Sequence, residues 1–367
     1  TLPIDKNDMQ VFTTREPLGV IAAVIPWNSQ QLLSAVKIAP ALAMGNTIIV
    51  KASEAAPTPL LELAKLIDKV GMPKGVVNII TGFADECSKV LTSHKKINRI
   101  AFTGGMHTAK HIVKNSAENL SQVTLELGGK SPVAVFNDAN IDNALNGVTA
   151  SIFGASGQSC IAGSRLYLQK DIYDDFLVKI SEKAKNINIG HPMNDDTQMG
   201  PLATLDQINN IQDKIDQTIK QGGKLIIGGE RPKDMNQGWY YKPTIIECDH
   251  HNLPVAENEL FGPVLSVMKF SDENEVIRLM NDNSYGLAAG VFTENNGTAL
   301  RVSKAVRAGI VFVNTYRLIS PIVPFGGFKN SGFGRESGME TIKDYSNLKT
   351  TWINTSKDPM GDPFIIK

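Results

Sequence analysis

Cys160 is the side chain whose setting is the most suggestive of chemistry. It stands among glycines and other small residues in the stretch 153–164, which can present a thiol on an exposed turn with close backbone approach to a ligand. A lone cysteine is much more often a buried structural thiol, and we interpret Cys87 and Cys248 in that way. Taken by itself, Cys160 would merit little more, so its chemistry depends on the segments that accompany it.

Glu126 and Asn28 each stand at the end of an apolar run that predicts a strand. Glu126 precedes the pair Gly128-Gly129, so it would face a cleft at the carboxyl edge of a sheet, where it could act as a general base. An ordinary strand-end carboxylate explains it about equally well. Asn28 could donate an amide N–H to a developing oxyanion, although a turn asparagine after Pro26 explains it too.

The elements that must position these residues alternate between strands and helices. Continuous apolar runs separated by helices indicate buried parallel strands covered on both faces, and such a sheet binds ligands at the carboxyl ends of its strands. We predict strands at 20–25, 47–50, 76–80, 99–102 and 123–127, and helices at 31–44 (interrupted at Pro40), 60–70 and 108–115.

A second α/β unit begins near Pro132. Its predicted helices are 141–153, 172–187, 206–221 and 273–281, and its predicted strands are 165–169, 265–270 and 310–314. A Gly- and Pro-rich loop at 324–338 follows, and the alternation at 350–354 predicts a late strand that could pair with another subunit. The fold class is therefore α/β.

Composition limits the kind of partner. Thirty-seven basic residues balance 37 acidic ones, which gives no general attraction to nucleic acid or to an acidic membrane. The three cysteines are far apart and odd in number, and no histidines stand at metal-ligand spacing. These features argue against a disulfide framework or a metal site and favour a reducing, cytoplasmic compartment. No apolar run is long enough to span a bilayer, and no secretory signal is visible.

Together, the three segments closely resemble the aldehyde dehydrogenase superfamily over essentially the whole chain. Further matches are Arg-Glu-Pro at 15–17, Lys-Ala-Ser-Glu at 51–54, Phe-Thr-Gly at 102–104, Glu-Leu-Phe-Gly-Pro at 259–263 and Pro-Phe-Gly-Gly-Phe-Lys at 324–329. Each fragment is weak alone, but eight fragments in the family order leave little room for chance. The segments 28–30, 51–54, 104–105 and 314–317 look like a bacterial branch that includes a hydroxybutyrolactone dehydrogenase, which suggests a cyclic or polar aldehyde or lactol.

The resemblance implies a mechanism. The thiolate of Cys160 attacks the aldehyde, and Asn28 with the backbone N–H of Cys160 holds the oxyanion. A hydride then leaves for the nicotinamide, and Glu126 activates the water that hydrolyses the resulting thioester. A CoA-acylating relative is the first alternative, although such relatives generally lack the glutamate. An inactive relative with a binding or structural role is the second, and esterase chemistry would be a side activity.

The resemblance also implies a set of cofactor-binding residues. Lys51 and Glu54 would bind the adenosine ribose. Because the carboxylate would repel a 2′-phosphate, NAD is the expected cofactor, with NADP as the alternative. Glu259 would hold the nicotinamide ribose, with Phe261 beside the ring. A phosphate-binding segment starts a helix at Gly104, where Ala109 and Gly105 replace the usual glycine and serine. The remaining cofactor residues expected are Ile25, Pro26, Trp27, Gly105 and Leu127.

The substrate pocket implied by the resemblance is wide and poor in aromatic residues. Arg317 could provide a counter-charge for a substrate carboxylate or polar group, although a surface or interface salt bridge explains it somewhat better. The pocket residues expected are Ser29, Ser159, Ile161, Arg317 and Ile319.

The family pattern divides the chain into four parts. We expect an oligomerisation or bridging segment at 1–17, a Rossmann-type NAD-binding domain at 18–128, an α/β catalytic domain at 129–340 and an oligomerisation tail at 341–367. The family has a substantial segment before the position that matches Thr1, so part of the cofactor domain would be missing. The expected assembly is a homodimer or a homotetramer.

Overall fold

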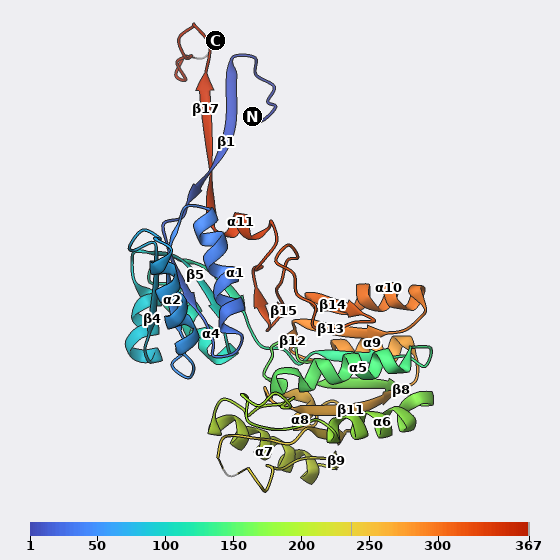
Figure 1. Cartoon of the computed structure of the whole chain (residues 1–367). Helices are drawn as coiled ribbons and strands as arrows, with labels where there is room; N and C mark the ends of the chain where they lie inside the picture. Colours follow the sequence, from blue (N-terminus) through green and yellow to red (C-terminus); the bar gives the residue numbers. More distant parts are fainter. Residues whose placement is uncertain (236, 366–367) are drawn as a thin grey trace.

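The computed structural model describes residues 1–235 and 237–365. Two α/β lobes, each built on its own sheet, lie beside each other, and a two-stranded arm projects from the first lobe (Figure 1). The first lobe contains the six-stranded sheet and the second contains the seven-stranded sheet. This arrangement confirms the predicted α/β fold class.

The sheet of the first lobe is parallel except at one edge. Its strand order is β16-β6-β5-β2-β3-β4, with only β16 antiparallel. Its strands are β2 (Val20–Val24), β3 (Thr47–Ala52), β4 (Val77–Thr81), β5 (Ile97–Thr103), β6 (Gln122–Glu126) and β16 (Gly332–Phe333). Its helical segments are α1 (Gln30–Ala43), α2 (Thr58–Lys69), η1 (Ala84–Ser88), α3 (Lys89–Ser93) and α4 (Met106–Ser116).

Burial on both faces explains why these strands are continuous apolar runs. In β2, Ile21 and Ala23 join one hydrophobic cluster, while Ala22 and Val24 join another on the opposite face. Successive side chains of a strand point to opposite faces, so a run that is apolar throughout can be covered only by helices on both sides.

The sheet of the second lobe has the order β14-β13-β7-β8-β11-β10-β9, and only β9 is antiparallel. Its strands are β7 (Pro132–Val135), β8 (Arg165–Gln169), β9 (Lys224–Ile227), β10 (Thr244–Glu247), β11 (Val264–Phe270), β13 (Ala288–Phe292) and β14 (Ile310–Val313). Its helical segments are α5 (Ile141–Phe153), η2 (Gly154–Gly157), η3 (Lys170–Ile172), α6 (Tyr173–Lys185), α7 (Leu205–Lys220), α8 (Pro254–Glu257), α9 (Glu273–Asn281) and α10 (Asn296–Ala305).

The arm pairs the two ends of the chain. The late strand, β17 (Ser346–Asn354), pairs with β1 (Met9–Pro17) of the same chain along nine residues, and its pairing with another subunit stays a prediction. The short helix α11 (Thr341–Asp344) leads into it. Both ends of the chain therefore lie at the arm (Figure 1).

Two further details concern continuity. Pro40 lies inside α1 and does not end it, because the carbonyl of Pro40 still accepts the N–H of Met44 at 3.1 Å.

The loop after β14 returns to the first lobe through β15 (Phe328–Lys329), which pairs with β12 (Tyr285–Gly286), and then through β16. The domain limits at 128 and 340 stay a prediction. Among the described residues, no helix is long and apolar enough to cross a membrane.

Candidate functional site

A tight turn presents Cys160. In η2, Ala155 and Ser156 both have φ of 55° and Gly157 has φ of 72°, so three successive residues lie in the left-handed region. Such a backbone costs on the order of 1–3 kcal/mol for each non-glycine residue and persists only where the surroundings hold it. A Cβ at Gly157 would lie 2.1 Å from the carbonyl oxygen of Gly262, so this position requires glycine.

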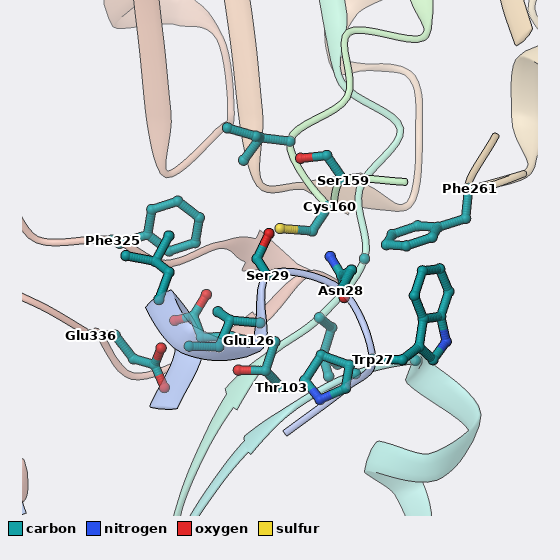
Figure 2. A pocket seen from close by; sticks show the side chains of 18 of the residues that line it. Trp27, Asn28, Ser29, Thr103, Glu126, Ser159, Cys160, Phe261, Phe325 and Glu336 are labelled. Atoms are coloured by element: carbon teal, nitrogen blue, oxygen red, sulfur yellow. The ribbon is translucent and has the colours of Figure 1, made fainter. Parts of the chain in front are cut away.

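Cys160 opens into a cavity of about 500 Å³ where the strand ends of the first sheet meet the second lobe (Figure 2). Most of the residues predicted from the sequence line it: Pro26, Trp27, Asn28, Ser29, Gly104, Gly105, Glu126, Leu127, Ser159, Cys160, Ile161, Glu259, Phe261, Arg317 and Ile319.

Three predicted cofactor residues lie away from the cavity lining. Ile25 is buried in one of the two hydrophobic clusters of the first sheet. Its only polar groups are the N–H and C=O of its backbone. Lys51 and Glu54 lie at and just after the carboxyl end of β3 and pair with each other at 2.6 Å. Partial burial acts to raise the pKa of Glu54, but the hydrogen bond and charge of Lys51 outweigh it, so the pKa is lowered.

Glu126, the last residue of β6, is an unusual buried acid. It is 3% exposed, and among the described residues neither carboxylate oxygen has a hydrogen-bond partner. Burial raises its pKa well above the ordinary value, and the neighbouring carboxylate of Glu336 adds to this, whereas Lys37 and Arg335 act in the opposite direction. A carboxylate that is poorly solvated is a stronger base than one in water.

A buried ion pair lies beside Glu126. The ammonium of Lys37, on α1, pairs with the carboxylate of Glu336 and also donates to the hydroxyl of Thr103 at 2.7 Å. Both charged side chains are at most 4% exposed. Figure 2 shows Glu126 and Glu336 on the same side of the cavity. The pair therefore places one positive and one negative charge beside the carboxyl group of Glu126.

Burial also governs the thiol. It raises the pKa of Cys160 to about 12, and the carboxylates of Glu259 and Glu126 add to the effect. The backbone N–H groups of Ile161 and Cys160 act in the opposite direction. The resting thiol is thus neutral, and a nearby base must remove its proton before it can attack.

Asn28 is held against the nucleophile turn. Its side-chain Nδ2 donates to the carbonyl of Gln158 at 3.2 Å, which leaves its second N–H for another acceptor. Figure 2 shows its amide close to Cys160. The amide and the backbone N–H of Cys160 are donors of the kind that an oxyanion requires.

Two glycines let the second lobe reach the strand end. A Cβ at Gly128 would lie 1.8 Å from the Glu259 carboxylate, and one at Gly129 would lie 2.6 Å from the carbonyl of Cys160. The N–H of Gly129 donates to Glu259 at 3.0 Å. Burial raises the pKa of Glu259 to about 7, against the effect of this hydrogen bond and of Lys130.

The remaining wall of the cavity is aromatic and backbone-rich. Trp27 and Phe261 meet edge to face with ring centroids 5.3 Å apart (Figure 2). Helix α4 begins directly after Gly105, which provides no side-chain cap and has open space beside it. Its first backbone N–H groups can therefore receive an anion.

Several lining residues were not predicted from the sequence. Gln207 could have been noticed, because Thr204 and Gln207 form a capping box at the start of α7, but nothing local indicates that its amide also donates to the carbonyl of Phe261 at 3.1 Å. The residues that were missed are Leu32, Leu33, Val36, Thr103, Gly128, Gln207, Phe325, Glu336 and Ser337.

Comparison with known proteins identifies the class. The model of the aldehyde dehydrogenase family matches residues 1–351. The chain belongs to the aldehyde dehydrogenase family and is an aldehyde dehydrogenase, as its motifs predicted.

Individual relatives agree with this class. A (Z)-2-((N-methylformamido)methylene)-5-hydroxybutyrolactone dehydrogenase of Acinetobacter baylyi is 53% identical, covering 100% of this chain and 75% of the relative. An aldehyde dehydrogenase of Emericella nidulans is 43% identical over 95% of this chain and 70% of its own length. An NAD+ complex of an aldehyde dehydrogenase from Bacillus cereus superposes with a TM-score of 0.94 at 39% identity, covering 97% of this chain and 72% of that one.

The buried acid predicts a specific pH dependence of stability. Because its pKa is raised on folding, the folded protein holds the proton of Glu126 more tightly than the unfolded chain does. The wild-type free energy of unfolding should therefore fall, relative to Glu126→Gln, as the pH rises from the ordinary glutamate value to the folded pKa. The difference between the free energies of unfolding of Glu126→Gln and wild type should change by about 1.4 kcal/mol per pH unit within this window, in favour of Glu126→Gln as the pH rises.

Denaturant unfolding of both proteins at a series of pH values measures this difference. Glu118→Gln, at an exposed position, provides the matched control for the loss of one carboxylate. A pH-independent difference for Glu126→Gln would contradict the strong desolvation of this carboxyl.

Proposed function

We propose that the enzyme oxidises an aldehyde to a carboxylic acid with NAD, through a thioester on Cys160. The observation that carries the proposal is the meeting of Cys160, Asn28 and Glu126 in one cavity, although they come from three distant parts of the chain. A nucleophile, an oxyanion donor and a poorly solvated base are the groups that acyl chemistry requires.

The residues present fit a nicotinamide dinucleotide. The start of α4 offers backbone donors for a pyrophosphate, while Glu54 and Glu259 offer carboxylates for ribose hydroxyls. Bound NAD supplies the oxidation itself by accepting a hydride. Trp27 and Phe261 would pack against the cofactor and exclude water from that end of the cavity.

The first step is attack on the aldehyde. The sulfur of Cys160 bonds to the carbonyl carbon, the thiol proton passes to a base, and the carbonyl oxygen becomes an oxyanion. Asn28 and the backbone N–H of Cys160 would donate to this oxygen. Protonation of Glu126 would remove one of the negative charges that raise the pKa of Cys160, so the two groups titrate together.

The last step is hydrolysis of the thioester. Glu126 would take a proton from a water molecule, whose oxygen then bonds to the acyl carbon as the carbon–sulfur bond breaks. The acid leaves, and the proton held by Glu126 passes to the sulfur of Cys160, which restores the thiol. A CoA-acylating reaction is the second candidate, and formation of an acyl-CoA instead of the free acid would favour it. The presence of Glu126 at the cavity wall favours water as the acceptor.

The arm and the cysteines support two further proposals. We propose that the arm mediates a homodimer or a homotetramer, because Leu348, Trp352 and Ile353 expose apolar surface on a strand that has one free edge among the described residues. We place the enzyme in the cytoplasm because Cys87, Cys160 and Cys248 are all free thiols.

Replacing the nucleophile tests the core of the mechanism. Cys160→Ala should abolish NADH formation from an aldehyde panel, because no covalent adduct can form, while Cys87→Ala should keep the wild-type rate. The measurement is absorbance of NADH with matched thermal unfolding. Normal turnover in Cys160→Ala would refute the assignment.

Replacing the base should separate the two half-reactions. Glu126→Gln should form no more than about one equivalent of NADH per active site and then stall, because the amide cannot activate water. Intact-mass measurement after mixing should find the acyl group on Cys160. Steady turnover at the wild-type rate would show that another group is the base.

Cofactor choice tests the role of Glu54. The wild type should use NAD far better than NADP, because its ionised carboxylate repels a 2′-phosphate. Glu54→Gln should narrow the ratio of kcat/KM values, mostly through the KM of NADP. Glu62→Gln, an exposed glutamate on α2, is the matched control. Equal use of both cofactors by the wild type would overturn the role given to Glu54.

A further inference from the structure

Arg317 has an unusual place in the cavity wall. It lies on the loop after β14 and is partly buried, with φ of 63°. One guanidinium nitrogen, Nη1, donates to the carbonyl of Gly154 at 2.9 Å and to that of Ala150 at 3.4 Å. A Cβ at Gly154 would lie 3.0 Å from the same nitrogen, so glycine leaves room for this contact. The side chain is thereby fixed beside the turn that presents Cys160.

The rest of the guanidinium has no protein partner. Among the described residues, none accepts a hydrogen bond from Nε or Nη2, and no carboxylate pairs with Arg317. A salt bridge within the chain is thus absent from the described residues, and an interface salt bridge stays a prediction. A partly buried cation without a counter-ion is unfavourable, and a ligand can relieve that cost by providing an anion.

Arg317 is also the one arginine or lysine among the described residues that line the cavity. Of the three acids in the lining, Glu336 is paired with Lys37. Burial lowers the pKa of Arg317, while Tyr316 and Cys160 act to raise it. An arginine nevertheless remains protonated in proteins. The cavity therefore has one fixed positive charge near the nucleophile.

We infer that Arg317 binds a carboxylate of the substrate, and that the enzyme prefers short aldehydes with a carboxylate at their far end. This inference rests on the proposed function, because it concerns the substrate of the same site. The planar guanidinium matches a carboxylate geometrically, and charge-assisted hydrogen bonds of this kind are stronger than neutral ones. Ile319 and Phe325 line the same cavity and can contact the carbon chain between the two groups.

The inference includes the ring-closed forms of such substrates. In an aldehyde acid with suitable spacing, a carboxylate oxygen bonds to the aldehyde carbon, and the former carbonyl oxygen takes the proton. The product is a hydroxylactone that reopens by the reverse steps. Such a lactone can therefore provide the open aldehyde acid that Arg317 and Cys160 would receive.

Capping of α5 is the competing explanation of Arg317. The contacts with Ala150 and Gly154 satisfy carbonyls at the end of that helix, where a positive charge is stabilising. A pure capping role predicts that loss of Arg317 lowers stability and affects all aldehydes alike. A substrate-binding role predicts an effect that depends on the substrate charge.

The test compares charged and uncharged aldehydes of equal length. Values of kcat and KM are measured for 4-oxobutanoate against butanal and for 5-oxopentanoate against pentanal, with wild type, Arg317→Met and Arg317→Lys. Wild type should prefer the oxo acid in at least one pair. Arg317→Met should reduce that preference by at least ~10-fold, mainly through KM, because the charge-assisted hydrogen bonds to the carboxylate are lost. Arg317→Lys should keep part of the preference.

Product binding provides a readout that does not depend on turnover. Succinate should protect the wild-type thiol from alkylation better than butanoate does, and Arg317→Met should remove that difference. Arg231→Met is the matched control, because Arg231 also donates to a backbone carbonyl, that of Gly238 at 2.7 Å, but lies outside the cavity lining.

The outcomes separate the two hypotheses. Equal use of charged and uncharged aldehydes by the wild type would overturn the role of Arg317 and leave the proposed function intact. If Arg317→Met lowers kcat/KM equally for charged and uncharged aldehydes and also lowers the melting temperature, the substrate-binding role of Arg317 is overturned in favour of helix capping, and the proposed function stays intact. Absence of NADH formation with every aldehyde would contradict the proposed function itself and remove the basis of this inference.

Discussion

Gly128 and Gly129 bring the two lobes into contact, and the site depends on that close approach. With any side chain at Gly128, the carboxylate of Glu259 could not occupy its position 1.8 Å from the missing Cβ. With one at Gly129, the backbone of Cys160 would be displaced. The strand end that bears Glu126 and the turn that bears Cys160 can share a cavity because the two residues at 128 and 129, where the lobes meet, have no side chains.

Close approach also excludes water, and this explains the electrostatics. Burial is the largest cause of the raised pKa at Glu126, Cys160 and Glu259 alike. Each of these groups is therefore more easily kept neutral than charged, which makes the acid a better base and leaves the thiol inactive until a proton is removed. The ion pair of Lys37 with Glu336 lies next to Glu126, and its two charges act on the pKa of Glu126 in opposite directions. The same packing thus positions the groups and tunes their ionisation.

Much of the candidate site could be predicted from the sequence, because the side chains that carry the chemistry lie at the ends of strands. Asn28 and Glu126 follow apolar runs, and the carboxyl ends of parallel strands meet at one edge. Lys37 gave no such signal, since one lysine in an apolar helix reads as a side chain directed to solvent. Its partner Glu336 is 299 residues away. No local pattern encodes a contact of that range.

The same reasoning applies to the arm. The alternation in β17 predicted a strand correctly, but a strand pattern does not name its partner, and β1 is more than 300 residues earlier in the chain. Long-range contacts of this kind also complete the site. Ser331 donates to the carbonyl of Gly128, 203 residues away, where β16 covers the edge of β6. Closing such long loops costs conformational entropy, which the packing around these contacts must offset. The wall that contains Glu336 can close over Glu126 only when the last part of the chain has returned to the first lobe.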